Sequence, residues 1–297
     1  MRDDLDMTRR LSELLRVPPG GVDLRTIDPR GTPGLPKAAV RDPKAWARAQ
    51  LPVLGAELFT WQEKLYAAAK SGSSRQRLLL LLQAMDCGGK DGTIKKVVGQ
   101  FNPQGVHIVA FGKPTEEELA HDFLWRIERG LPGAGVIGVF NRSHYEDVLV
   151  VRVHNLVPAR TWRSRYAKIN RFEQRVVEDG CAVVKIMLHI SPEEQQRRLL
   201  DRLADPTKYW KYNPGDVDER ALWPAYQEAY ADALGKCDSD EAPWYVVPAD
   251  RKWYRDWAVA NLLLEKLREL NPAYPPADFD PDVERGRLVT APEVNSG

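Results

Sequence analysis

Short apolar runs alternate with amphipathic segments over most of the chain. The apolar runs lie at 76–85 (QRLLLLLQAM), 106–112 (VHIVAFG), 135–141 (GVIGVFN), 182–190 (AVVKIMLHI) and 244–249 (WYVVPA). Each is rich in aliphatic or aromatic residues and is bounded by glycine, proline or charged residues, which is typical of a buried strand. The pattern therefore predicts five strands.

Segments with apolar residues at helical spacing lie between and around these runs. Helices are expected at 43–70, from Lys90 onward, at 115–130, between 141 and 180, at 191–205, at 218–235 and at 250–270. Ser191 is placed as an N-cap, with Pro192 at the first helical position. Strands that alternate with helices predict a parallel sheet covered on both faces. The expected fold class is α/β, as one three-layer α/β/α domain.

The ends of the chain differ from this middle part. Residues 1–41 are rich in proline, glycine and charge, and they are expected to form an extended arm lying on a domain or on a partner subunit. Residues 42–270 would form the single domain. The proline-rich tail, 271–297, is expected to be irregular.

Composition and charge narrow the function classes. The chain has 297 residues, of which 43% are hydrophobic and 29% charged, with a net charge of +1. Such a balance does not favour a protein that coats nucleic acid or an anionic membrane. No apolar run approaches the roughly 20 residues that a membrane span needs. Three widely spaced cysteines without a CxxC motif favour a reducing cytoplasm and no structural zinc.

The first apolar run leads into a glycine-rich turn, MDCGGKDGT, and then into a predicted helix. A strand, a glycine loop and a helix that starts at a lysine form the context of a phosphate-binding loop. Gly88, Gly89 and Gly92 allow close backbone approach to anions, and Lys90 supplies a mobile charge. Thr93 is the nearest hydroxyl. The alternative is a tight strand-to-helix turn with a solvated lysine.

Two carboxylates, Asp86 and Asp91, flank the glycines. Carboxylates beside a polyanion would repel it unless a cation lies between them. Oxygen ligands combined with substrate phosphates are what Mg²⁺ prefers, so both residues are candidate metal ligands. Mn²⁺ is the alternative ion. For Asp91 an equally simple interpretation is that its charge stabilises the start of the helix.

Polar residues also follow the third strand, in NRSHYEDVLVVR. Ligands of doubly wound sheets bind beyond the carboxyl ends of the strands, where Asn141, Arg142 and Glu146 would lie. Arg142 is suited to clamp a phosphate. Arg152, ten residues on, either continues the site or forms a surface ion pair.

The segment at about 197–220 combines basic and aromatic residues. It contains Arg197, Arg198, Arg202, Lys208 and Lys211, with Tyr209, Trp210 and Tyr212 between them. An insert between two helices at this place is where a lid would bring cations to a transferring phosphoryl group. A solvated basic helix and a nucleic-acid contact are the alternatives, and the neutral net charge disfavours the second.

Taken together, these motifs resemble the second polyphosphate kinase family, whose fold is that of thymidylate kinase, a P-loop kinase. The resemblance covers residues 61–270 and includes QAMDCGGKDGTIKKV, FNPQGV, GVFNRSHYEDVLVVRV, ISPEEQQRRL, DPTKYWKYNPGD and APWYVVPADRKWYRD. It implies a Mg²⁺-dependent enzyme that moves the terminal phosphoryl group of inorganic polyphosphate to nucleotides, reversibly. It also implies a homodimer or homotetramer. Some members have Asp where this chain has Asn141, so the metal contact is expected mainly from Asp86.

The motifs and the resemblance give one set of expected roles. Catalysis is assigned to Asp86, Lys90, Arg142 and Arg198; phosphate binding to Cys87, Gly88, Gly89, Lys90, Asp91, Gly92, Thr93, Lys95, Lys208 and Lys211; nucleotide binding to Asn141, Arg142, Glu146 and Arg152; metal binding to Asp86 and Asp91. In this family an acidic residue at the position of Glu146 accompanies the use of monophosphates. The likeness is therefore to the class that converts AMP to ADP and on to ATP.

Three other functions fit parts of the pattern. They are an ATP-dependent nucleoside monophosphate kinase of the same fold, a polyphosphate kinase restricted to nucleoside diphosphates, and a polyphosphate sensor without turnover. Reaction of AMP with polyphosphate in the absence of ATP would separate the first and last of these from the proposed enzyme.

Overall fold

A computed structural model describes residues 9–290 of the chain. Its five strands are β1 (Arg77–Ala84), β2 (Val106–Ala110), β3 (Ile137–Asn141), β4 (Cys181–His189) and β5 (Trp244–Pro248). They form one parallel sheet in the order β2-β3-β1-β4-β5. The five predicted strands are confirmed, and their parallel pairing agrees with the expected fold class.

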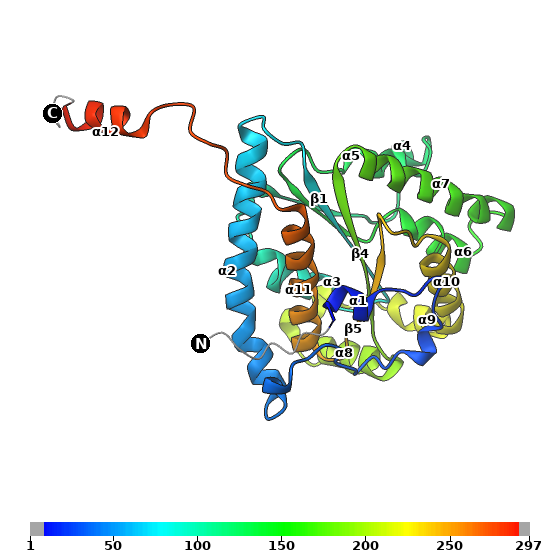
Figure 1. The fold of residues 1–297 in the computed structure, drawn as a ribbon. Coiled ribbons are helices and arrows are strands. Elements are labelled where there is room, and N and C mark those ends of the chain that lie inside the picture. Colours follow the sequence, from blue (N-terminus) through cyan, green and yellow to red (C-terminus); the bar gives the residue numbers. More distant parts are fainter. Residues whose placement is uncertain (1–8, 291–297) are drawn as a thin grey trace.

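The apolar runs reflect burial on both faces of this sheet. All eight residues of β1, the central strand, are buried, which explains why its sequence shows no polar alternation. Helices α2 (Pro43–Lys70), α3 (Lys90–Lys96) and α11 (Lys252–Leu270) cover one face. Helices α7 (Ala159–Glu178) and α10 (Trp223–Lys236) cover the other (Figure 1).

Short helices complete the chain. They are α1 (Leu11–Leu15), α4 (Glu116–Leu119), α5 (Trp125–Arg129), α6 (Val150–Val153), α8 (Pro192–Leu203), α9 (Gly215–Ala221) and α12 (Pro281–Thr290), with 3₁₀ turns η1 (Leu24–Thr26), η2 (Lys37–Ala39), η3 (Val98–Gln100), η4 (Pro103–Gly105), η5 (His144–Asp147) and η6 (Pro206–Lys211). None of the helices within 9–290 is long and apolar enough to cross a membrane.

Two predicted helices are interrupted. The helix expected at 115–130 is split into α4 and α5, because the Asp122 carboxylate accepts a hydrogen bond from the Leu124 amide and turns the chain. The helix expected at 218–235 is split into α9 and α10 at Leu222. Pro224 at the start of α10 lacks the N–H that a continuous helix would need.

The N-terminal arm packs on its own domain. Leu11, Leu15 and Leu24 are buried in the common core, and the Val17 amide donates to the Trp244 carbonyl over 2.9 Å. The arm therefore covers the open edge of β5, which protects that edge from other strands. It contains α1, η1 and η2, so it is only partly extended. Residues 1–8 of the predicted arm lie outside the described residues.

The sequence predicts an irregular C-terminal tail, but part of this tail is helical. Helix α12 occupies ten of its residues and stands away from the body of the domain (Figure 1). The remainder up to Asp280 has no regular structure except bends, and 291–297 lie outside the described part. The expected dimer or tetramer stays a prediction.

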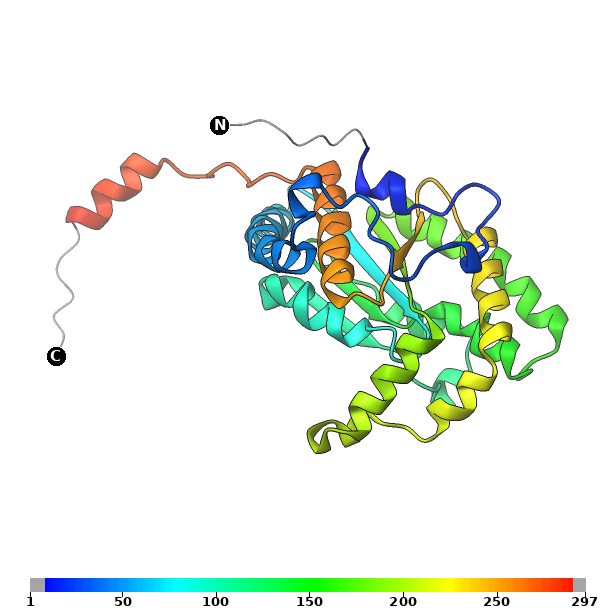
Figure 2. The same cartoon turned by 90° about the horizontal axis from the view of Figure 1, so that it is seen from below.

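The lid segment, defined here as residues 192–221, comprises α8, η6 and α9. It leaves the sheet at the carboxyl end of β4 and projects from the domain (Figure 2). Ser191 caps α8 through a hydrogen bond from the Glu194 amide, with Pro192 at the first helical position, as predicted. The segment begins five residues before the expected start of the lid, at 197.

Candidate active site

The loop between β1 and α3 turns sharply beneath a cavity. Cys87 and Gly89 have positive φ angles of 61° and 107°. The positive φ of Gly89 favours glycine at this position, and a Cβ atom there would also displace the Arg255 guanidinium. The Gly88 amide closes the turn on the Met85 carbonyl over 2.9 Å. The loop thereby has the compact shape expected of a phosphate cradle.

The cavity above the loop has a volume of about 550 Å³. Its lining contains eight basic side chains, Lys90, Arg142, Arg198, Arg202, Lys208, Lys211, Lys252 and Arg255, and four acidic ones, Asp86, Asp91, Asp201 and Asp216. We call it the cationic cavity. An excess of positive charge in a recess attracts polyanions and suits phosphate chains.

Lys90 is buried at the floor of this cavity. Its ammonium donates to the Ala84 carbonyl over 2.9 Å. Burial, and next the nearby Arg142 charge, lower its pKa. Asp86, Glu146 and Asp91 offset this effect in part, and a phosphate group that enters the cavity would add further negative charge beside the ammonium.

Asp86 and Arg142 join the first and third strands at their carboxyl ends. Their carboxylate and guanidinium lie 3.0 Å apart. Arg142 has a φ of 64°, an unusual backbone angle for a residue with a side chain. Such strained positions concentrate at functional sites. The prediction that these two residues share a site with Lys90 is consistent with this geometry.

Asn141 and Asp91 are also brought together. The Asn141 amide donates to the Asp91 carboxylate over 2.8 Å. This bond holds the carboxylate at the edge of the cationic cavity, where it could serve as a metal ligand as well as stabilise the start of α3. Asn141 orients this carboxylate, whereas an aspartate at the same place would repel it.

Arg198 lines the cavity, but its donors are already engaged. Its guanidinium donates to the Cys87 carbonyl over 2.8 Å, to the Ala249 carbonyl over 2.5 Å and to the Glu194 carboxylate over 2.6 Å. Burial lowers its pKa. In this structure Arg198 ties the lid segment to the phosphate loop. Lys208 and Lys211 also line the cavity from the lid segment, where Lys208 pairs with Asp205 over 2.7 Å and the Lys211 ammonium lies over the Trp210 ring.

A second, smaller cavity of about 230 Å³ adjoins the first. Asp86, Arg142, Asn213 and Asp216 line both, so the two recesses meet at these side chains. Glu146 lies only in the smaller one, and burial raises its pKa. Two adjoining recesses with a shared basic residue can hold two phosphorylated molecules end to end.

Three predicted residues do not line these cavities. Arg152 pairs with Asp232 over 2.5 Å and stacks on Trp162, so the ion-pair interpretation fits this arginine. Lys95 is exposed on the far part of α3. Thr93 is buried, and its hydroxyl has no hydrogen-bond partner among residues 9–290.

Several site residues were missed from the sequence. Lys252 and Arg255 begin α11, just beyond the carboxyl end of β5, and the rule that located Arg142 could have found them. Asp216 reaches the cavity from the lid, where it pairs with Arg202 over 3.4 Å, through a fold of the chain that no local pattern signals.

Gln195 was also missed. It is 1% exposed, and its amide nitrogen donates to the Asp86 carbonyl over 2.9 Å. Its amide oxygen accepts from Arg220 over 2.8 Å, and Arg220 also donates to the Pro192 carbonyl over 3.0 Å. Gln195 and Arg220 therefore link both ends of the lid segment to the phosphate loop.

The carboxylates fit a divalent cation only together with a substrate. Within residues 9–290 no group of three or more His, Cys, Asp and Glu side chains is arranged to hold a metal. Mg²⁺, however, commonly takes one or two carboxylates and completes its shell with phosphate oxygens and water. Asp86 and Asp91 both line the phosphate cavity and supply that partial set.

Comparisons with known proteins agree with this geometry. Residues 42–274 match the family described as Polyphosphate kinase 2. The chain is 46% identical over 258 residues to an AMP/ADP-polyphosphate phosphotransferase of Meiothermus ruber, covering 87% of this chain and 93% of that protein. It is 42% identical over 226 residues to an ADP-polyphosphate phosphotransferase of Rhodopseudomonas palustris, covering 72% and 76%. A crystal structure of polyphosphate kinase 2 from Arthrobacter aurescens TC1 superposes with a TM-score of 0.91 at 48% identity, covering 98% and 100%.

Proposed function

Because the chain belongs to the polyphosphate kinase 2 family, we propose that it transfers the terminal phosphoryl group of inorganic polyphosphate to AMP and to ADP. Its fold is the P-loop kinase fold expected from the sequence. The observation that carries the proposal is the pair of adjoining recesses, one strongly cationic, that meet at Asp86 and Arg142.

The cationic cavity is assigned to polyphosphate. Its eight basic side chains can neutralise a chain that carries about one negative charge per phosphate, whereas a single nucleotide needs fewer. Lys90 and the loop amides would hold the terminal phosphates. The lid residues Lys208 and Lys211 would close over the chain and exclude water.

The smaller cavity is assigned to the acceptor nucleotide. It contains Glu146, Tyr226 and Tyr230, and it opens onto Arg142. An acceptor phosphate oxygen placed there attacks the terminal phosphorus of the donor. The new P–O bond forms as the bridging P–O bond breaks, and the shortened polyphosphate keeps the bridging oxygen. Because this transfer needs positioning and charge neutralisation above all, cations at the junction are the main catalytic device.

Asp86 and Asp91 would hold Mg²⁺, or Mn²⁺ in its place, with phosphate oxygens and water as the other ligands. When bound, the ion neutralises phosphate charge. Without it, the Asp86 carboxylate is paired by Arg142, so the cation and the guanidinium can share this carboxylate.

An ATP-free assay tests the proposal. The protein is incubated with polyphosphate, Mg²⁺ and AMP, ADP, GMP or GDP, and the products are separated by ion-exchange chromatography. ADP followed by ATP is expected from AMP. If no product forms with polyphosphate while ATP plus AMP reacts, the protein is an ATP-dependent monophosphate kinase. Product from ADP but never from AMP would restrict it to diphosphates.

A further inference from the structure

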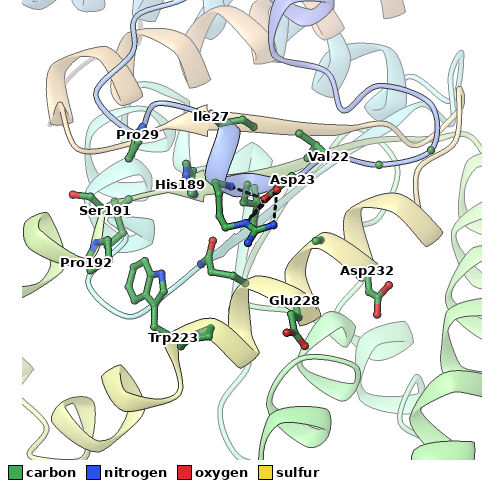
Figure 3. Close-up of a pocket in the computed structure, with 18 residues that line it drawn as sticks. Val22, Asp23, Ile27, Pro29, His189, Ser191, Pro192, Trp223, Glu228 and Asp232 are labelled. Carbon is green, nitrogen blue, oxygen red and sulfur yellow. Dashed lines mark hydrogen bonds and ion pairs between the residues drawn. The ribbon is translucent and has the colours of Figure 1, made fainter.

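A third cavity, of about 830 Å³, lies apart from the two that carry the proposed reaction. Its walls come from the N-terminal arm at residues 20–29, the end of β4 with the start of α8 at 189–192, and helix α10 (Figure 3). None of the residues that line it lines the other two cavities. We call it the arm cavity.

The charge of the arm cavity is opposite to that of the cationic cavity. Asp23, Glu228 and Asp232 line it, with Arg25 as its one basic lining residue. Arg25 is paired with Asp23 over 2.8 Å. Glu228 and Asp232 both pair with Arg152, over 4.0 Å and 2.5 Å. Acidic side chains outnumber basic ones in the lining, and its one arginine is already paired, so the cavity is poorly suited to a phosphate. A nucleotide or polyphosphate is therefore a poor occupant.

The cavity also has a flat apolar surface and polar atoms without partners. Trp223 of α10 faces it (Figure 3), and among the described residues no aromatic ring or cation stacks on this indole. The Gln227 amide nitrogen is buried and has no hydrogen-bond partner within 9–290. Nor has Nδ1 of His189, a side chain that is 5% exposed.

Buried polar atoms are rarely left unpaired in folded proteins. A donor on Gln227 requires an acceptor from an occupant, and Nδ1 of His189 can give or take one hydrogen bond. Burial lowers the pKa of His189, so the ring is neutral at pH 7. A flat ring that carries hydrogen-bond acceptors would pair with these atoms and stack on the indole, and an exocyclic amine on it could donate to a remaining lone pair of a lining carboxylate.

We propose that the arm cavity binds an uncharged purine nucleoside or nucleobase, with the base stacked on Trp223 and hydrogen-bonded to Gln227 and His189. The occupant contacts Pro192 and Trp223, which stand at the two ends of the lid segment. Arg220 joins those ends through its bond to the Pro192 carbonyl. The arm cavity is thus placed where an occupant touches the supports of the lid without entering the phosphate sites.

Calorimetric titration of the full chain with adenosine tests this site. Saturable binding is expected at one site per chain, and it should persist when ADP and polyphosphate fill the other cavities. AMP should not compete for this site, because its phosphate meets the carboxylates. Guanosine, titrated in parallel, distinguishes a general purine site from one selective for the exocyclic amine.

Variants of the cavity give the decisive comparison. Trp223→Ala should weaken adenosine binding by about 10-fold or more, since stacking on an aromatic side chain is a large part of base binding. Trp223→Phe, which keeps an aromatic ring, should retain most of the affinity for adenosine. Gln227→Leu, which keeps the side-chain size, should weaken binding by about 5-fold. Thermal melting of each variant shows that it is folded.

Two outcomes overturn the proposal. One is the absence of saturable binding by adenosine and guanosine at concentrations up to about 5 mM, which corresponds to negligible affinity. The other is binding that is unchanged in both Trp223→Ala and Gln227→Leu but abolished by ADP. That result would place the nucleoside in the acceptor cavity. Neither outcome bears on the ATP-free assay, so the two proposals fail separately.

Discussion

The cationic cavity and the arm cavity both border helix α8, yet they are built in opposite ways. Residues of α8 line both: Pro192 borders the arm cavity, while Arg198 and Arg202 border the cationic one. The arm cavity is the larger in volume and has mostly apolar or acidic walls. The cationic cavity is smaller, but eight basic side chains converge on it. Volume alone would therefore select the wrong recess for phosphate chemistry.

The difference shows what a phosphate site needs beyond space. In the cationic cavity, charged side chains are removed from water, although water would stabilise their charged forms. Lys90 is buried with a lowered pKa, and Arg142 has a strained backbone. In the arm cavity Asp23 is paired with Arg25, and Asp232 and Glu228 are paired with Arg152 behind the wall. The atoms without partners there belong to the neutral side chains of Gln227 and His189. A buried lysine with a lowered pKa beside a strained arginine marks the cationic cavity as a site for anions.

The contrast between the two cavities is tested most directly by removing the charges at the floor of the cationic cavity. Lys90→Ala and Asp86→Ala should each lower the rate of ADP phosphorylation by at least ~100-fold, because one preorganised electrostatic contact commonly contributes that much. Steady-state kinetics with polyphosphate and ADP measures the loss. Lys44→Ala, an exposed lysine on α2, is the matched control. Near-normal turnover in both site variants would contradict the assignment of the phosphate site.

A second test breaks the connection between the lid segment and the phosphate loop. Gln195→Leu removes the bonds to both the Asp86 carbonyl and Arg220, and kcat should fall by about 10-fold, since a small displacement of the loop is costly to phosphoryl transfer. Gln195→Glu keeps the acceptor for Arg220 but loses the donor to Asp86. Its kcat should therefore resemble that of Gln195→Leu.

Arg220→Leu completes this series. It leaves the bond between Gln195 and Asp86 in place, so the loss in kcat should be smaller, about 3-fold. The KM values for polyphosphate should change less than kcat in all three variants. If Gln195→Leu lowers the melting temperature while its kcat stays normal, Gln195 serves stability alone and does not position the loop.

A third test sharpens the contrast within the active site, between donor and acceptor recesses. Glu146→Gln should lower the kcat/KM ratio of AMP to ADP by about 10-fold while polyphosphate binding is kept, since the change removes one charge from the acceptor side only. An equal loss with AMP and ADP would mean that Glu146 does not select the acceptor.

The acidity of Glu146 adds a pH dependence to this test. Burial raises the pKa of its carboxyl, so the group becomes neutral at a higher pH than an exposed glutamate would. As the pH falls through this pKa, the AMP to ADP ratio of the unaltered protein should approach that of Glu146→Gln. The variant corrects for the titration of the substrates, because only the carboxyl of Glu146 differs between the two profiles.

The smallest effect is expected outside both cavities. Lys95→Ala should raise the KM for long polyphosphate by about 2-fold and leave that for short chains unchanged, because an exposed charge contributes little in salt solution. Measurement across chain lengths shows the difference. An unchanged KM for chains of every length would mean that the donor does not run along the exposed side of α3.

Local sequence was sufficient for the five strands and located the loop on which the candidate site is centred. The run from Leu78 to Leu82 is uniformly apolar because β1 is buried on both faces, and this signal is contained in the residues themselves. The phosphate loop, Arg142 and the start of α8 at Ser191 followed from short motifs at strand ends. Where a single side chain overrides helical periodicity, as at Asp122, the pattern predicted one helix and the structure has two.

Only the tertiary structure determines which distant residues lie beside the phosphate loop. Gln195, Asp216 and Arg255 lie more than a hundred residues from Asp86 along the chain, and only the folded lid and the order of the strands bring them beside it. The return of the N-terminal arm to the edge of β5 likewise creates the arm cavity from three separate segments. Sequence periodicity reports whether a residue faces the core or the solvent, because that depends on its neighbours in the chain. Which distant charges meet depends on packing, and no local pattern records it.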